Sequence, residues 1–88
     1  MRYAIRIKAS AARELQRIER PDRERLVAAI DRLAENPFAG SALKGELRGL
    51  RRIRVGGYRV LYEVRERDLV VLVLRAAHRR DAYRLRSR

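Results

Sequence analysis

Cysteine and tryptophan are absent from this chain of 88 residues, and phenylalanine, methionine and histidine each occur once. Without cysteine, the protein has no disulfide framework, no zinc ribbon and no thiolate nucleophile. The spacing of its acidic side chains and its histidine does not resemble a metal site. We therefore expect no metal and no other cofactor, and the lack of cysteine suits a protein of the reducing cytoplasm.

Long apolar runs are also missing. The longest, Leu69–Leu74, is far too short to cross a bilayer. The first residues, Met1–Lys8, alternate between apolar and polar side chains, which is unlike a signal peptide. We find no repeat and no linker, so the sequence predicts one small domain over residues 1–88.

Acidic side chains are scarce and unevenly distributed. The chain has 23 basic and 11 acidic residues and a net charge of +12. Residues 1–43 carry 9 basic and 6 acidic side chains, whereas residues 44–88 carry 14 and 5. Because a strongly basic region attracts polyanions, the expected partner is nucleic acid, an anionic membrane or an acidic protein.

The first half of the chain predicts a strand followed by a helix. Tyr3, Ile5 and Ile7 alternate with more polar residues, as in a half-buried strand. Ser10 is the expected helix N-cap, and an apolar period of three to four residues continues to about Arg20.

Pro21 separates this helix from a second one. The second helix carries an apolar stripe of Leu26, Ile30 and Leu33, and Asn36-Pro37 is its expected end. Because the connection is short, we expect the two helices to form an antiparallel hairpin.

The second half predicts strands. A glycine-containing loop over Phe38–Leu50 leads to a hairpin, and Arg65–Asp68 forms a polar turn. The aliphatic run Leu69–Leu74 is typical of a central strand buried on both faces. The tail, Ala76–Arg88, is expected to form a short helical turn. The order β-α-α-β-β-β predicts an α+β domain, with a helical hairpin packed on an antiparallel-rich sheet.

Gly56-Gly57 lies between two alternating runs, which is a strong signal for a two-residue hairpin turn. Such a turn places Arg54 opposite Arg59. Since side chains alternate across a strand, Arg52, Arg54 and Arg59 share one face and the apolar residues share the other. We expect the helices to cover the apolar face and to leave the arginine-bearing face open.

The three arginines predict a phosphate-binding surface. Two like charges directly opposite each other cost stability, unless an anion or water screens them. The guanidinium fork matches phosphate oxygens and keeps its charge at physiological pH. The tail would extend this surface, with Tyr83 stacked on an unpaired base and three further groups near it: His78, Arg79 and Arg80. The alternative is an ordinary solvated strand face, with Tyr83 anchoring the tail and His78 as a polar surface residue.

Four motifs, together with the order of elements, carry a family resemblance; they are Asn36-Pro37, Leu43-Lys44-Gly45, the segment from Arg52 to Tyr62, and His78-Arg79-Arg80-Asp81-Ala82-Tyr83. Together they resemble the RelE toxins of the RelE/ParE superfamily over nearly the whole chain. The resemblance implies a ribosome-dependent endoribonuclease that cuts mRNA in the A site. It also implies a cognate acidic antitoxin that binds the toxin in a hetero-oligomer. No membrane partner is implied.

The resemblance also implies site residues. Carried over by position, the catalytic candidates are Arg52, Arg54, Arg59, Arg79 and Tyr83, with His78 as a further one, and the RNA-phosphate contacts are Lys44, Arg51 and Arg80. Arg52 and Arg54 occupy places where lysine is typical. Because arginine does not lose its proton, Tyr83 or His78 becomes the candidate general base, or the enzyme relies on electrostatic stabilisation alone.

Two other functions fit the same residues. The ParE branch of the superfamily shares the fold and poisons DNA gyrase without cutting RNA. A non-catalytic basic module that binds nucleic acid or an acidic protein is the third possibility. Gyrase trapping or mRNA cleavage would distinguish the first two, and neither activity would favour the third.

Overall fold

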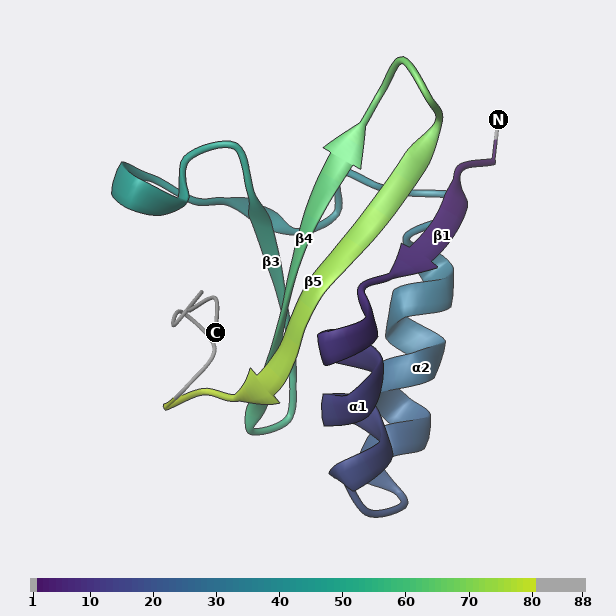
Figure 1. Ribbon diagram of the computed structural model, residues 1–88, viewed down its shortest axis with the longest axis vertical. Coiled ribbons are helices and arrows are strands. Elements are labelled where there is room, and N and C mark those ends of the chain that lie inside the picture. Colours follow the sequence, from purple (N-terminus) through teal and green to yellow (C-terminus); the bar gives the residue numbers. More distant parts are fainter. Residues whose placement is uncertain (1, 81–88) are drawn as a thin grey trace.

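The computed structural model describes residues 2–80 and contains two helices packed on a five-stranded mixed sheet (Figure 1). In chain order the elements are β1 (Ala4–Ile7), α1 (Ala9–Arg17), α2 (Asp22–Arg32), β2 (Ser41–Ala42), the 3₁₀ turn η1 (Gly45–Leu47), β3 (Arg51–Val55), β4 (Tyr58–Arg65) and β5 (Val70–His78). The predicted α+β fold and order of elements are confirmed. The predicted loop before the hairpin additionally contains β2 and η1.

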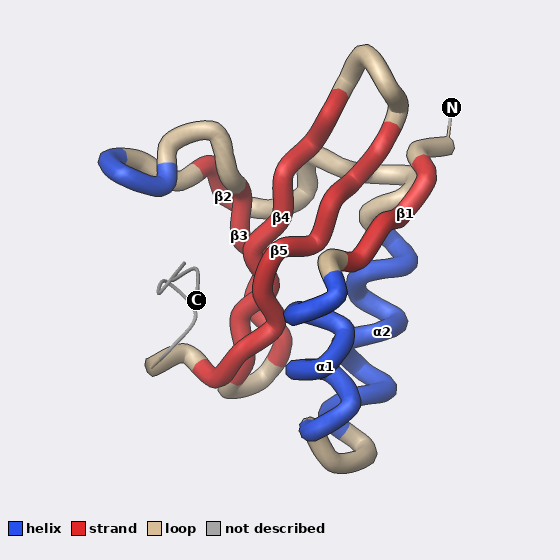
Figure 2. The backbone as a smooth tube through the Cα atoms, viewed as in Figure 1, coloured by secondary structure: helices blue, strands red, loops and turns tan. Residues whose placement is uncertain are grey.

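The sheet has the strand order β1-β5-β4-β3-β2. β1 pairs with β5 in parallel, and the other neighbouring strands are antiparallel. Both helices lie on one side of this sheet (Figure 2). Among residues 2–80, no helix is long and apolar enough to span a membrane.

The helix boundaries differ from the prediction at both ends. α1 begins at Ala9 with Lys8 at its N-cap position, so the prediction that Ser10 is the cap is wrong. The reason is tertiary: the Lys8 N–H donates to Val73 O at 2.9 Å, which keeps Lys8 in the sheet and starts the helix directly after it.

α2 ends at Arg32 rather than at Asn36-Pro37. The chain tightens after Arg32, because the N–H of Leu33 donates to Ile30 O at 3.0 Å and that of Ala34 donates to Asp31 O at 3.1 Å. Bonds of this i→i−3 type satisfy the last carbonyls of a helix and terminate it.

The hydrophobic core fills the space between the helices and the sheet face that they cover. Leu15 of α1 and Leu26 and Ile30 of α2 meet the buried Tyr62 and Val73 of the sheet. Burying a side chain of this size contributes about 1.5–3 kcal/mol. The core therefore fixes which face of the β3–β4 hairpin points toward the helices.

β5 departs from the prediction in two respects. Val71 and Val73 are fully buried but Leu72 and Leu74 are only half-buried, so the strand is not buried on both faces. The strand also continues through His78, where a helical turn was expected, because β4 offers pairing partners as far as Tyr58. The rest of the predicted turn lies outside the described residues.

Candidate functional site

The β3–β4 hairpin has the predicted register. Arg54 pairs with Arg59 and Ile53 pairs with Val60 around the two-residue turn. Gly56 has a φ of 60°, a conformation that side chains disfavour, whereas Gly57 is not in that region. Glycine with positive φ at the first central position is the pattern of a type II′ hairpin turn.

The two faces of the hairpin are chemically opposite. Ile53, Val55 and Tyr58 pack against the core beneath the helices. The other side carries Arg52, Arg54 and Arg59, which we call the arginine face, and no described helix covers it (Figure 1). The predicted separation of faces is confirmed.

Arg59 is central to the arginine face. It lies between Arg54 on β3 and the small side chain of Ala77 on β5. Arg59 is half-buried, and within residues 2–80 its Nε is buried without a hydrogen-bond partner. A buried donor without a partner costs about 1–3 kcal/mol, so an acceptor arriving at this group would recover free energy.

The loop before β2 forms one wall of the site. Arg52 and Arg54 line an open hollow of about 530 Å³ together with Ala39 and Gly40 of this loop and Ser41, the first residue of β2. Tyr62 holds the loop in place, since its hydroxyl donates to Pro37 O at 2.8 Å and accepts from Gly40 N–H at 3.0 Å. Only glycine fits at position 40, because a Cβ there would lie 2.5 Å from Arg52 O.

Arg51, one of the predicted phosphate contacts, is engaged away from the arginine face. The Arg51 guanidinium donates to Gly40 O at 3.1 Å and Phe38 O at 3.2 Å, and lies 5.2 Å from the Phe38 ring centroid. Arg51 therefore supports the loop rather than the arginine face. Lys44 is exposed in the loop immediately before η1.

The end of β5 approaches the hairpin turn, but a β-bulge determines which side chains reach the arginine face. The β4–β5 register shifts between Leu61 and Tyr62. Before the bulge, the odd-numbered Val71 and Val73 point into the core. After it, the even-numbered Ala76 does, so the bulge changes the parity of the residues that face the core.

Because of this parity change, His78 lies on the helix side of the sheet. Its ring meets that of Tyr58 edge-on, with centroids 5.8 Å apart. The structure therefore does not bring His78 together with the arginine face. Arg79 lies beside the turn, since its N–H donates to Gly57 O at 3.0 Å. Arg80 is exposed and Tyr83 lies outside the described residues.

One contact near this strand end has no signal in the sequence. Glu14 of α1 accepts from Arg75 Nη2 at 2.7 Å and from the Ala76 N–H at 3.0 Å. It thereby ties the first helix to the bulge that precedes Ala77. Nothing in the local pattern pairs two groups so distant in the chain, and only the shared fold brings them together.

The chemistry available at the site is electrostatic. Within the described part of the chain, neither Arg54 nor Arg59 forms an ion pair, and no three His, Cys, Asp or Glu side chains gather as metal ligands. Fixed guanidinium groups with open donors bind phosphate oxygens and stabilise negative charge that builds on them.

Comparisons with known proteins give the family. The matching family model describes the ParE toxin of type II toxin-antitoxin systems and spans residues 5–83. Toxin RelG of Mycobacterium tuberculosis is 32% identical over 90 residues, which cover 96% of this chain and 99% of RelG. Toxin RelE of the same organism is 35% identical over 89 residues, which cover 94% of this chain and 88% of RelE.

The fold agrees with that of solved toxins. The toxin in the RelBE2 toxin-antitoxin complex from Mycobacterium tuberculosis matches with a TM-score of 0.82 and 31% identity, over 90% of this chain and 100% of that chain. The family model matches most of this chain, and relatives agree with it in both sequence and structure. This chain therefore belongs to the RelE/ParE superfamily of toxins of type II toxin-antitoxin systems.

Proposed function

We propose that this toxin is a ribosome-dependent endoribonuclease that enters the A site and cleaves mRNA. The observation that carries the proposal is the facing pair of Arg54 and Arg59, for which the described residues supply no acidic partner. A scissile phosphate between the two guanidinium groups would relieve their repulsion and satisfy the buried Arg59 Nε.

The reaction proposed is internal transesterification. The ribose 2′-oxygen attacks the adjacent phosphorus, the bond from phosphorus to the 5′-oxygen breaks, and the products are a 2′,3′-cyclic phosphate and a free 5′-hydroxyl. Negative charge builds on the phosphate oxygens in the transition state. Arg59, supported by Arg52 and Arg54, would stabilise that charge, with Arg79 contributing from the end of β5.

Proton transfer needs another group, because arginine keeps its proton. A base must take the proton of the 2′-hydroxyl, and an acid must protonate the leaving 5′-oxygen. Tyr83 and His78 are the proposed candidates. The position of His78 on the helix side of the sheet favours Tyr83 for this role.

The proposal includes an acidic antitoxin that binds this toxin in a hetero-oligomer and a cytoplasmic site of action, where ribosomes translate. The net charge of +12 and the RelBE2 toxin-antitoxin complex among the structural relatives support the antitoxin partner. Complementary charge speeds encounter and selects the orientation of binding.

The test is primer extension on a reporter mRNA in a reconstituted translation reaction. Wild-type toxin should cut the message only while it is translated. Arg59→Ala should slow cleavage by about a hundredfold or more, the usual effect of removing one transition-state donor. Arg67→Ala removes the same charge from an exposed turn and should cut normally. Full activity of both Arg59→Ala and Arg79→Ala would refute the ribonuclease proposal.

Inhibition of DNA gyrase is the second candidate, favoured by the ParE description of the matching family model. Purified toxin would then trap gyrase on DNA, and expression of the toxin in cells would induce an SOS response without shortening any mRNA. A supercoiling assay run beside primer extension distinguishes the two functions, since each predicts a signal in only one assay.

A further inference from the structure

The pairing of β4 with β5 continues one residue beyond the end of β5. Tyr58 lies opposite His78, the last residue of that strand. One step further in the same register, the Arg79 N–H donates to Gly57 O at 3.0 Å. Figure 1 shows this end of β5 beside the turn that joins β3 and β4. Arg79 is therefore attached to the turn by the same kind of hydrogen bond that joins the two strands.

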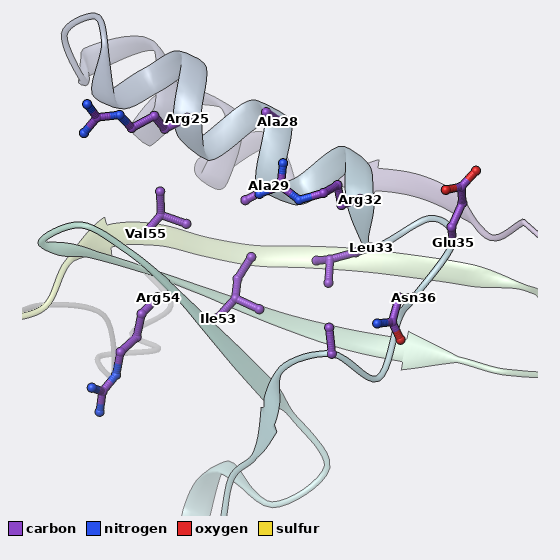
Figure 3. Close-up of a pocket in the computed structure, with 11 residues that line it drawn as sticks. Arg25, Ala28, Ala29, Arg32, Leu33, Glu35, Asn36, Ile53, Arg54 and Val55 are labelled. Carbon is purple, nitrogen blue, oxygen red and sulfur yellow. The ribbon is translucent and has the colours of Figure 1, made fainter.

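The register also determines the side of the sheet on which Arg79 lies. On β3, Ile53 points toward α2 and Arg54 points away from it (Figure 3). Arg59 has Arg54 opposite it on one side and Ala77 on the other, so these three share one face. Since side chains alternate along a paired strand, Arg79, two residues after Ala77, lies on the arginine face as well.

The His78 ring lies on the other side of the sheet, against the hairpin turn. It meets the Tyr58 ring edge-on, with an interplanar angle of 81°. A Cβ on Gly57 would be 3.7 Å from His78 Nε2, which is an ordinary van der Waals distance, so the ring lies over the turn. With Glu14 and Arg17 of α1, it lines an open pocket of about 280 Å³. These contacts fix the place of the ring.

The same ring binds the backbone just beyond the strand. The Arg80 N–H donates to His78 Nδ1 at 3.4 Å. A ring nitrogen accepts a hydrogen bond only when it carries no proton, so this bond requires a neutral His78 with its proton on Nε2. Asp and Asn side chains stabilise turns in a similar way, by accepting from an N–H two residues ahead. The backbone is thus held on both sides of Arg79.

We propose that His78 is a positioning residue that holds Arg79 on the arginine face. In this assignment the Arg79 guanidinium contacts the scissile phosphate, and His78 acts only through the backbone that carries it. A displacement of about 1 Å at a reacting group can lower a rate about a hundredfold, so a side chain that fixes such a group matters for the reaction. The inference rests on the ribonuclease function proposed above.

The geometry separates this role from that of a general base. A base must lie within hydrogen-bond reach of the 2′-hydroxyl whose proton it takes. The phosphate is proposed to bind on the arginine face, whereas the His78 ring meets Tyr58 on the helix side. Moreover, Nδ1 already accepts from the Arg80 N–H, and Nε2 then carries the proton. Neither nitrogen is available to take a proton from the substrate.

The test measures mRNA cleavage on the ribosome in single-turnover reactions with toxin in excess. Two substitutions distinguish the ring nitrogens, because His78→Asn keeps an acceptor near the place of Nδ1 and His78→Gln keeps one near the place of Nε2. His78→Ala and His78→Gln should lower the maximal rate about tenfold or more, and His78→Asn should recover most of that loss. The toxin concentration that gives the half-maximal rate should change little.

Other roles for His78 give other patterns. Neither asparagine nor glutamine acts as a base at neutral pH, so a general base would be lost equally in all three variants. A residue that only binds RNA would change the half-maximal concentration and leave the maximal rate unchanged. Either pattern, or full activity of His78→Ala, overturns the proposal. Circular dichroism and thermal melting check that each variant keeps the wild-type fold.

A double-mutant cycle tests whether His78 acts through Arg79. In the Arg79→Ala background, His78→Ala should have little further effect on the maximal rate, because the side chain that it positions is already gone. If the two substitutions instead lower the rate independently, so that their effects multiply, His78 does not act through Arg79 and the proposal is overturned.

Hydrogen exchange provides a readout that does not depend on RNA cleavage. The Arg80 amide should exchange about threefold or more faster in His78→Ala and His78→Gln than in the wild type and in His78→Asn. If exchange follows this pattern but the wild-type toxin cuts no mRNA, the contact is supported and the ribonuclease proposal fails. If cleavage depends on Arg59 but exchange is the same in all four proteins, the role of His78 is refuted and the ribonuclease proposal stands.

Discussion

Arg54 and Arg59 stand opposite each other on neighbouring strands, and each raises the positive potential at the other. In an isolated sheet this arrangement destabilises the pair. The fold retains it because Ile53 and Val60, the next pair along the same hairpin, lie on the opposite face and pack against the core. Arg54 and Arg59 therefore repel each other in the folded protein, and an anion bound between them would reduce that repulsion.

Arg59→Lys tests how much the shape of the guanidinium matters. Lysine keeps the positive charge but has no planar fork and donates as a single ammonium. We expect Arg59→Lys to recover only part of the cleavage lost in Arg59→Ala, measured as single-turnover rates on the ribosome. Equal rates for lysine and arginine would mean that charge alone suffices at this position.

Tyr62 carries a second prediction at the residue scale. It is fully buried, and its hydroxyl donates to Pro37 O and accepts from the Gly40 N–H. Tyr62→Phe leaves both backbone groups without this partner and should lower the free energy of unfolding by about 1–3 kcal/mol. Urea denaturation of the two proteins measures this difference. Tyr58→Phe, at a half-buried residue of the same strand, is the control and should cost less.

Among the elements, β5 connects the helices to the site. Its first part pairs with β1 and packs in the core, and its last part runs beside β4 to the hairpin turn. The bulge between these parts is held by Glu14 of α1 through Arg75 and the Ala76 N–H. The first helix thus sets the position of Ala77 and Arg79 relative to Arg59.

Glu14→Ala should loosen this connection. The Glu14 side chain is only 27% exposed, so losing the carboxylate removes the acceptor of the Ala76 N–H at a poorly solvated place and breaks the ion pair with Arg75. We expect a loss of about 1–3 kcal/mol in the free energy of unfolding. Glu14→Gln can still accept from the Ala76 N–H and should lose less. Hydrogen exchange at Ala76 and Ala77 would rise in the alanine variant, and unchanged exchange would contradict the role assigned to Glu14.

The whole molecule is a small basic domain whose positive charge is concentrated in its second half. A net charge of +12 opposes compaction by self-repulsion, and salt screens that repulsion. An anion bound to the arginine face would add a specific effect, because any ligand of the folded state stabilises it.

Sulfate separates the specific effect from screening. At equal ionic strength, sulfate should raise the melting temperature of the wild-type protein more than chloride does. The excess should shrink in Arg54→Ala/Arg59→Ala. It should persist in Arg48→Ala/Arg67→Ala, which removes the same charge from exposed loops outside the site. An identical sulfate effect in all three proteins would show that the arginine face binds no anion.

The sequence by itself determined the local features of this protein. Gly56-Gly57 and the alternation on both sides of it were sufficient to predict the register of Arg54 against Arg59. That prediction succeeded because a two-residue turn leaves one pairing, and a single buried face then fixes which side chains point outward. The order of helices and strands could likewise be predicted, because the period of the apolar residues differs between a helix and a strand.

Only the tertiary structure decided where the other candidate groups lie. Arg51 lies next to Arg52 in the strand, but its guanidinium donates to Phe38 O in the loop. His78 lies on the helix side of the sheet because the bulge changes which residues of β5 face the core. The Glu14–Arg75 pair likewise joins residues far apart in the chain. These outcomes depend on contacts between distant segments, and local periodicity carries no information about such contacts.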